Sequence, residues 1–277
     1  NPGSGQSVTG GPTARFEDLM GRFFGLLCAL LFLSACSSTP QTSGSGDDDL
    51  VNGKDVRGFE HMISALSHNV NEIWGREALF AGKFDYVKYT DQYKSRAHID
   101  FSSGHIMVET VSGLDPRAHL RRAIIETLLT PDDPAEVDLY SDREIMPGGE
   151  PFLYGQVLDN QGQAIRSSWR AERYADYLIA NAMKKRTLGI RNIFFIDIPM
   201  VANHEDRRGY KYASIIRDAS RKYGVAESLI YAVIKTESSF NPYAVSHANA
   251  YGLMQVIPAT AGRDVYVRVK GKDGQPT

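Results

Sequence analysis

The chain of 277 residues is long enough for two domains of ordinary size. Hydrophobic residues make up 42% of it and charged residues 23%, a composition that excludes a wholly disordered chain and is typical of a globular protein. The net charge of −2 gives no indication of a nucleic-acid partner, and none is expected.

The first segment with a clear pattern is a signal sequence at residues 20–36. One cation, Arg22, precedes an apolar run, Phe23 to Leu33, that is too short to cross a bilayer. A serine and an alanine then stand directly before Cys36, as in a bacterial lipobox. This pattern predicts that Cys36 is acylated. The alternative is a plain secretory signal with a cysteine near its cleavage site.

A lipid on Cys36 would anchor the protein to a membrane. Ser37 follows instead of the aspartate that favours inner-membrane retention. By resemblance to bacterial lipoproteins, the expected location is therefore the outer membrane, facing the periplasm. Residues 1–19 precede a complete signal that starts at Met20, so we expect them to be an upstream, non-native or mis-started segment. Residues 37–49 contain no aliphatic or aromatic residue, which predicts a flexible linker.

Residues 50–200 mix helical and strand patterns, which predicts a non-catalytic α+β domain with a largely antiparallel sheet. In chain order we expect a helix over 61–74, a hairpin over 94–111 turning at 102–104, a helix over 117–129, a second hairpin over 151–165 turning at 159–162, a helix over 171–185 and a strand over 190–201.

Two polar patterns in this domain are candidates for functional sites. His98 and His105 could face each other across the first hairpin, but no cysteine or spaced carboxylate completes a metal-ligand set, so no metal site is expected. The cations at 184–186 are expected at the end of the 171–185 helix, where positive charge interacts favourably with the helix dipole.

Residues 201–277 read as the start of an all-helical domain. A first helix is expected to bury Tyr212, Ile215, Ile216 and Ala219 on one face and to stop at Gly224. A second helix over 226–240 is expected to end before the Asn-Pro pair at 241–242, because a residue before proline avoids helical geometry.

On this second helix an apolar stripe is formed by Leu229, Ile230, Val233 and Ile234, and Glu237 continues it at spacings of three and four. The last turn of a helix disfavours negative charge. Partial burial acts in the same direction. Both effects favour a protonated carboxylic acid, which is what a general acid for a glycosidic oxygen requires.

No second carboxylate can be placed beside Glu237. Glu227 lies ten residues earlier, about 15 Å along the helix axis. Asp264 lies beyond a turn, and nothing positions it. Two-carboxylate sites need separations of roughly 5 to 9.5 Å. Spacing alone would therefore favour a structural glutamate at a helix end.

A longer motif reverses this preference. The segment "ESSFNPYAVS" at 237–246, followed by "GLMQ" at 252–255, resembles the active-site signature of the lytic transglycosylases of the goose-type lysozyme superfamily. The interval from Glu237 to Gln255 matches as well. Earlier segments, including "YVKYTDQYKSRAHIDF" and "EPFLYGQVLDNQGQ", resemble the non-catalytic domain of membrane-bound lytic murein transglycosylases.

The resemblance implies a lysozyme-like fold and peptidoglycan glycan strands as the substrate. In this family a single glutamate protonates the glycosidic oxygen and then, as a base, activates the muramyl C6 hydroxyl, which closes a 1,6-anhydro ring. Glu237 matches that glutamate. Ser246 and Gln255 match positions that bind the sugar or orient the acid, Met254 would be a wall of the cleft, and Ser238 would pack or cap the helix end. No cofactor is implied; proteins of cell-wall synthesis or lysis are expected partners.

Two departures from the family pattern affect the expectation. Asn249 stands where the family commonly has glycine, and asparagine tolerates the left-handed backbone that this turn needs. The sequence also stops at residue 277 before the family's "AYNGG"-like segment, so we expect the lysozyme-like domain of 201–277 to be incomplete. The alternatives are a cell-wall-binding lipoprotein without catalysis in this truncated form and a hydrolytic muramidase.

Overall fold

The computed structural model describes residues 48–246 and 248–271. It divides the chain into two compact units, Asn1–Gly53 and Lys54–Thr277, and the architecture below is that of the second unit. The expected signal sequence with Cys36, the segment 1–19 and the linker up to residue 47 lie outside the described residues. Across the ranges just given, no helix has the length and apolar character of a membrane span.

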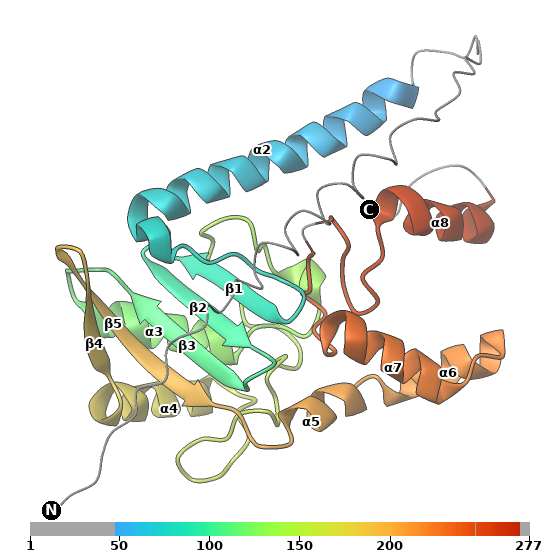
Figure 1. The fold of residues 1–277 in the computed structure, drawn as a ribbon. Coiled ribbons are helices and arrows are strands. Elements are labelled where there is room, and N and C mark those ends of the chain that lie inside the picture. The colour runs from blue at the N-terminus through green and yellow to red at the C-terminus, as the bar shows by residue number, and fades with distance from the viewer. Residues whose placement is uncertain (1–47, 247, 272–277) are drawn as a thin grey trace, which may run out of the picture. The chain divides into compact units, whose positions relative to one another are not determined.

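A five-stranded antiparallel sheet is the centre of the first part of this unit (Figure 1). Its spatial order is β1-β2-β3-β5-β4. The strands are β1 (Asp85–Thr90), β2 (Ser95–Asp100), β3 (His105–Thr110), β4 (Lys184–Leu188) and β5 (Arg191–Pro199). The expected α+β class with an antiparallel sheet is confirmed, as is the hairpin that turns at residues 102–104.

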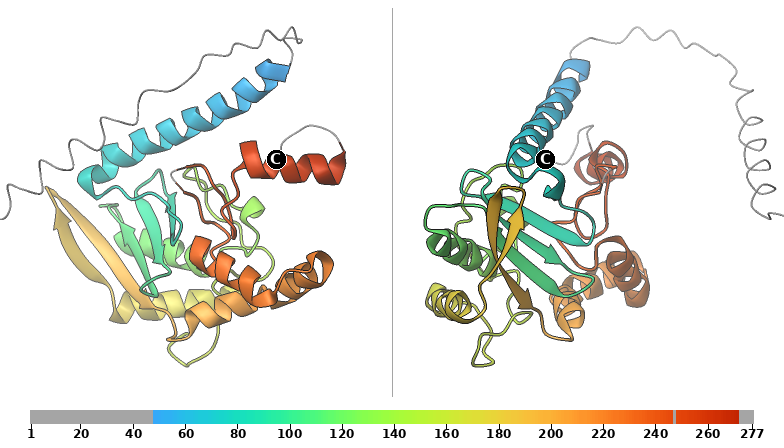
Figure 2. Two further views of the ribbon diagram at one scale, coloured as in Figure 1. Left: turned by 45° about the vertical axis from the view of Figure 1, so that its right-hand side comes forward. Right: turned by 60° about the vertical axis from the view of Figure 1, so that its left-hand side comes forward.

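Helices cover both faces of the sheet. They are α2 (Asp48–Trp74), which begins inside the expected linker, α3 (Pro116–Leu128) and α4 (Ser168–Asn181), with 3-10 turns η1 (Gly75–Glu77) and η2 (Pro134–Glu136). Helices α3 and α4 lie together on one side (Figure 2), where they share a core with Ile99, Ile106 and Ile196. On the opposite face, Val70 and Trp74 of α2 pack against alternate strand residues such as Val87.

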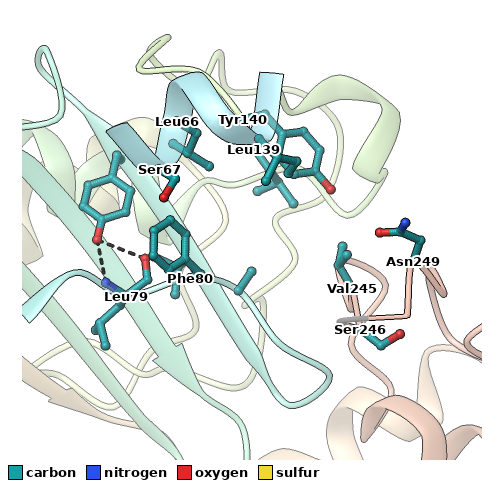
Figure 3. Close-up of a pocket in the computed structure, with 13 residues that line it drawn as sticks. Leu66, Ser67, Leu79, Phe80, Leu139, Tyr140, Val245, Ser246 and Asn249 are labelled. Carbon is teal, nitrogen blue, oxygen red and sulfur yellow. Dashed lines mark hydrogen bonds between the residues drawn. The ribbon is translucent and has the colours of Figure 1, made fainter. Parts of the chain in front are cut away.

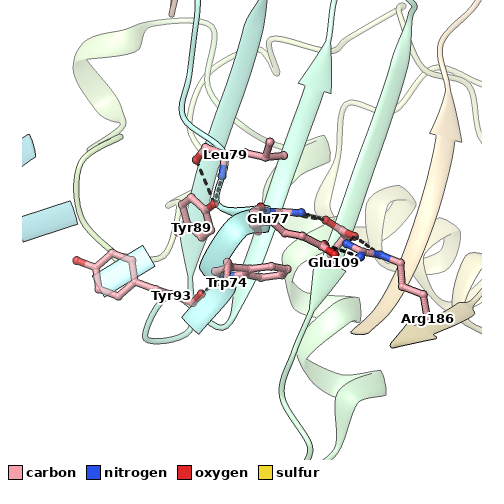
Figure 4. A network of polar contacts seen from close by, with 8 residues as sticks. Trp74, Glu77, Leu79, Tyr89, Tyr93, Glu109 and Arg186 are labelled. Atoms are coloured by element: carbon pink, nitrogen blue, oxygen red, sulfur yellow. Dashed lines mark hydrogen bonds and ion pairs between the residues drawn. The ribbon is translucent and has the colours of Figure 1, made fainter. Parts of the chain in front are cut away.

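A buried ion network fixes the end of α2 on the sheet (Figure 4). Glu109 on β3, only 3% exposed, accepts a hydrogen bond from Arg96 Nε at 2.7 Å and one from Arg186 Nη2 at 2.8 Å. Arg186 also pairs with the Glu77 carboxylate at 2.5 Å, and the Arg96 guanidinium lies 4.0 Å from the centre of the Trp74 ring. Charges buried in this way persist because every one of them has partners.

The expectation that the cations at 184–186 end a helix is wrong. Helix α4 stops at Asn181, and residues 184–186 belong to β4, which pairs with β5. The local sequence of residues 184–186 does not favour a strand, but tertiary contacts do. These residues pair with the apolar strand β5, and Arg186 forms an ion pair with Glu109.

Two further local expectations need correction. The second hairpin has its turn, since Asp159 Oδ1 accepts from the backbone N–H groups of residues 161 and 163, but its arms form only one isolated bridge, Leu158 to Ala164. His98 does not face His105. The β2–β3 register places Met107 opposite His98, and the two histidines bond Asp85 and Asp197 instead.

Two ionisable side chains are buried between α3 and the sheet. Burial raises the pKa of Glu126 to about 7, Glu144 adds to this effect, and Arg122 and Lys88 oppose it. Burial lowers the pKa of Lys88 to about 8, although its ammonium donates to two backbone carbonyls of the loop 138–141 at 2.6 and 2.8 Å. The shifts have opposite signs because burial disfavours whichever form is charged.

The C-terminal part is helical: α5 (His204–Tyr210), α6 (Ala213–Tyr223), α7 (Glu227–Ser238), the π-helical turn η3 (Pro258–Gly262) and α8 (Arg263–Lys270). Tyr212, Ile216 and Ile234 form a small core with Phe240. The expected stop of α6 at Gly224 is confirmed, with φ at 67°.

The expected apolar faces of these helices are only partly buried. Ile216 and Ile234 are in the core, but Ile215 is 64% exposed and Leu229 is 57% exposed. Ile215 lies about 100° round the helix from Ile216, so the narrow core formed with Phe240 cannot include both. The single helix expected before Gly224 is also divided into α5 and α6.

Candidate active site

Glu237 lies in the last turn of α7, and its side chain is 35% exposed. The helix ends at once, because Ser239 and Phe240 both adopt left-handed backbone conformations, with φ of 50° and 60°. Phe240 is fully buried in the small helical core. The buried phenylalanine thus holds the turn in place, while the glutamate stays accessible at the helix end.

Ser238 connects this helix end to the second half of the motif. Its side chain is fully buried, and its hydroxyl donates to the backbone carbonyls of Ile234 at 3.1 Å and Leu253 at 2.8 Å. The second bond joins the glutamate helix to the segment 252–255. Ser238 therefore packs at the helix end, the first of the two roles expected of it, and it fixes the spacing between the two parts of the motif.

The other motif residues shape the loop that follows. Ser246 Oγ accepts from the backbone N–H of Ala250 at 3.1 Å, which closes the turn in which Asn249 has the expected left-handed φ of 55°. Gln255 Nε2 donates to two loop carbonyls at 3.1 Å each, and its buried Oε1 has no hydrogen-bond partner among the described residues. Met254 is 46% exposed.

A lysine from the α+β part contacts the glutamate. Lys83 Nζ lies 2.8 Å from Glu237 Oε2, and the two side chains are 39% and 35% exposed. The segment that carries Lys83 is held on both sides, because Asn241 Nδ2 donates to Asp85 O at 3.1 Å and the Val245 N–H donates to the carbonyl of residue 82 at 3.4 Å. Sequence reasoning missed Lys83, since nothing in its own neighbourhood indicates a role.

Arg208 on α5 forms a second connection between the two parts. It is fully buried, its Nε donates to Ser239 O at 2.6 Å, and its Nη1 donates to Gln156 Oε1 at 2.7 Å. Its guanidinium also lies 4.5 Å from the centre of the Phe101 ring. Burial lowers the pKa of Arg208 to about 10. One cation thus joins the residue where α7 ends to the core of the α+β part.

A mainly apolar cavity of about 360 Å³ lies beside the loop (Figure 3). Its walls come from α2, from the segment 79–81, from Tyr140 and from the loop residues Val245, Ser246 and Asn249. A volume of this order can hold a small ligand group or ring. Over the part of the chain that the structure describes, no group of three or more His, Cys, Asp or Glu residues is arranged to hold a metal ion.

In a comparison with known proteins, the α+β part and the helical part each match a family model. The transglycosylase SLT domain model matches residues 214–274, which include Glu237 and the loop after it, so the helical part is a transglycosylase domain. The N-terminal domain model of membrane-bound lytic murein transglycosylase C matches residues 52–211. The chain belongs to the membrane-bound lytic murein transglycosylase C family.

Curated relatives agree with this assignment. The membrane-bound lytic murein transglycosylase C of Klebsiella pneumoniae (strain 342) is 52% identical over 260 residues, which cover 93% of this chain and 71% of the relative. The protein of that name from Yersinia enterocolitica has the same identity and coverage. The one from Photorhabdus laumondii is 56% identical over 226 residues, 81% of this chain and 63% of the relative. The resemblance seen in the sequence is confirmed.

Proposed function

We propose that this protein is a peptidoglycan lytic transglycosylase, which cleaves the β-1,4 bond between N-acetylmuramic acid and N-acetylglucosamine without water and leaves 1,6-anhydromuramyl ends. The observation that carries the proposal is the place of Glu237: an accessible carboxyl at the end of α7, inside a matched transglycosylase domain. The names of the relatives support murein as the substrate.

Glu237 serves in both steps of the proposed reaction. As the acid it gives its proton to the glycosidic oxygen while the bond from that oxygen to the muramyl C1 breaks. As the resulting carboxylate it takes the proton of the C6 hydroxyl, whose oxygen forms the new bond to C1. The proton that Glu237 loses is thereby regained, and water is not consumed. The nucleophile belongs to the substrate, so this chemistry needs no second enzyme carboxylate.

Lys83 and the loop residues have supporting roles in this proposal. The Lys83 ammonium, 2.8 Å from Glu237 Oε2, is placed to stabilise the carboxylate that exists between the two steps. Ser246 and Met254 are proposed to contact the sugar, because Ser246 lines the cavity beside the loop and Met254 is exposed. Gln255 is proposed to orient the acid by holding the loop beside it, because its Nε2 donates to two loop carbonyls.

We further propose that Cys36 carries a lipid that holds the protein on the outer membrane, facing the periplasm, after removal of the signal at 20–36. The names of the relatives as membrane-bound proteins support an anchor. The part of the expected linker before α2, residues 37–47, would supply a tether, and proteins of cell-wall synthesis or lysis are the proposed partners. Metabolic labelling with palmitate should mark the parent, and Cys36→Ser should abolish the label.

Mass spectrometry of the products released from purified peptidoglycan tests the activity. The parent should release 1,6-anhydromuramyl products, and Glu237→Gln should release none. Glu227→Gln, an exposed glutamate on the same helix, is the matched control and should behave as the parent. Free reducing ends would instead identify a hydrolytic muramidase. If neither the parent nor the control releases products, the chain is a non-catalytic cell-wall protein.

A further inference from the structure

Helix α4 carries an aromatic surface that the proposed reaction does not use. Trp169, Arg173 and Tyr177 lie four residues apart and therefore share one face of the helix. Trp169 is 59% exposed and Tyr177 is 42% exposed, although both are large apolar side chains. Together with Asn160 and Gln161 they line a hollow of about 190 Å³, which we call the α4 surface.

The α4 surface is held in a defined shape. Asp159, whose side chain is 6% exposed, accepts from Arg170 Nη1 at 2.6 Å and from the backbone N–H of Gln161 at 2.9 Å. These bonds tie the turn that carries the two amides to the first turn of α4. Tyr177 stacks on Tyr174, with ring centres 6.3 Å apart and planes 12° apart. A surface ordered in this way loses little conformational entropy when it binds a ligand.

The side chains of the α4 surface fit a substituted sugar with an acidic group nearby. An exposed indole can stack on the apolar C–H face of a pyranose ring. The amides of Asn160 and Gln161 offer donors and acceptors to hydroxyl and acetamido groups. The Arg173 guanidinium, 4.9 Å from the centre of the Trp169 ring, can pair with a carboxylate beside the stacked ring.

The size and surroundings of the α4 surface favour a sugar over a folded protein. Its volume of about 190 Å³ is below the roughly 300 Å³ at which pockets for drug-sized molecules begin, so it suits a single ring. The exposed residues beside it on α4, Glu172 and Asp176, are charged. Protein interfaces have a less charged centre and a larger continuous apolar area.

We propose that the α4 surface is a second peptidoglycan-binding site, which holds one sugar of a glycan strand against Trp169 and a stem-peptide carboxylate on Arg173. The site belongs to the α+β part and shares no lining residue with the cavity beside Ser246. This proposal rests on the proposed function, because that function identifies the polymer as peptidoglycan. Its role would be to keep the enzyme on insoluble cell wall between cleavage events.

Co-sedimentation with purified sacculi tests this site. The Glu237→Gln background is used throughout, so that binding is measured without cleavage. Trp169→Ala and Arg173→Ala should each weaken binding roughly tenfold, as expected for loss of a central aromatic or arginine anchor. Tyr223→Ala removes an aromatic side chain on α6 that is 66% exposed, and it should bind as the background does. Unchanged binding of both α4 variants would overturn the proposal.

Insoluble chitin, a β-1,4 chain of N-acetylglucosamine that carries neither lactyl nor peptide carboxylates, separates the two contacts. On chitin Trp169→Ala should still weaken binding, whereas the effect of Arg173→Ala should disappear. Loss of the Trp169→Ala effect on chitin would refute sugar stacking. Failure of the proposed activity can be told apart from failure of this binding site. The activity is judged from the products that the parent releases, whereas the binding site is judged from co-sedimentation.

Discussion

The buried ion network around Glu109 allows a direct test of how burial controls the strength of an ion pair. The substitution Glu109→Gln keeps the shape and one acceptor oxygen but removes the charge between Arg96 and Arg186. Glu109 and Arg96 side chains are each 4% exposed, so water cannot solvate the arginine charge that the substitution leaves behind.

The expected loss in the free energy of unfolding follows from that burial. Removal of one partner from a buried pair typically costs about 3–5 kcal/mol. Arg96 keeps its bond to the carbonyl of Glu77 and its contact with Trp74, 4.0 Å from the ring centre, so we expect the lower end of the range, about 3 kcal/mol. For a unit of this size that corresponds to a loss of roughly 6–12 °C in Tm.

Asp176→Asn on α4 is the matched control. Asp176 also accepts two bonds from one arginine, with Arg121 Nε at 2.5 Å and Nη2 at 3.2 Å, but its side chain is 59% exposed. A solvated pair of this kind is worth less than about 1 kcal/mol. Urea unfolding of the parent and both variants gives the two free energies. Equal costs for the two substitutions would refute the reasoning that burial decides the magnitude.

Three further substitutions have defined outcomes. Arg208→Met should lower the free energy of unfolding by about 2–4 kcal/mol in a thermal melt, because it leaves the buried Gln156 Oε1 and the partly buried Ser239 O unpaired. Ser238→Ala should cost about 1–3 kcal/mol by the same measurement and should also slow the release of soluble products, since it frees Leu253 O from the glutamate helix. The pKa of Glu126 in the fold, about 7, lies above its ordinary 4.5, so the parent should lose stability as the pH rises from about 4.5 through 7. Glu126→Gln should flatten that part of the curve, as checked by urea unfolding at pH 5 and pH 8.

The helices, strands and turns that were predicted correctly are those whose own residues favour the secondary structure that they adopt. The alternation around Ile99 and Ile106 and the Ser-Ser-Gly turn between them specify the first hairpin. Gly224 stops α6 because only a residue that accepts a left-handed backbone can end the helix in this way. In both places local preference and the final packing agree.

The errors arose where tertiary partners decide the outcome. Residues 184–186 become a strand because β5 pairs with them, and their sequence alone looks like a solvated helix end. The register that separates His98 from His105 is set by the turn at 101–104, which pairs Asp100 with His105 and so places Met107 opposite His98. The arms of the 151–165 segment have strand-like composition, yet they pair with no strand of the sheet, and one bridge, Leu158 to Ala164, joins the two arms.

In the candidate active site, too, the residues within the motif were predicted from the sequence, whereas a residue from a distant segment was not. The motif locates Glu237 and predicts that Ser238 packs or caps the helix end, because all the residues that it involves lie in one short segment, 237–255. Lys83 lies 154 positions earlier and reaches the carboxylate because Asn241 and the Val245 N–H hold the backbone on both sides of it. The α+β part thus brings a cation to the carboxylate that the transglycosylase motif supplies. The charge beside Glu237, and with it the proposed chemistry, therefore depends on both parts of the fold, and a change in Asn241 should act on Glu237 through Lys83.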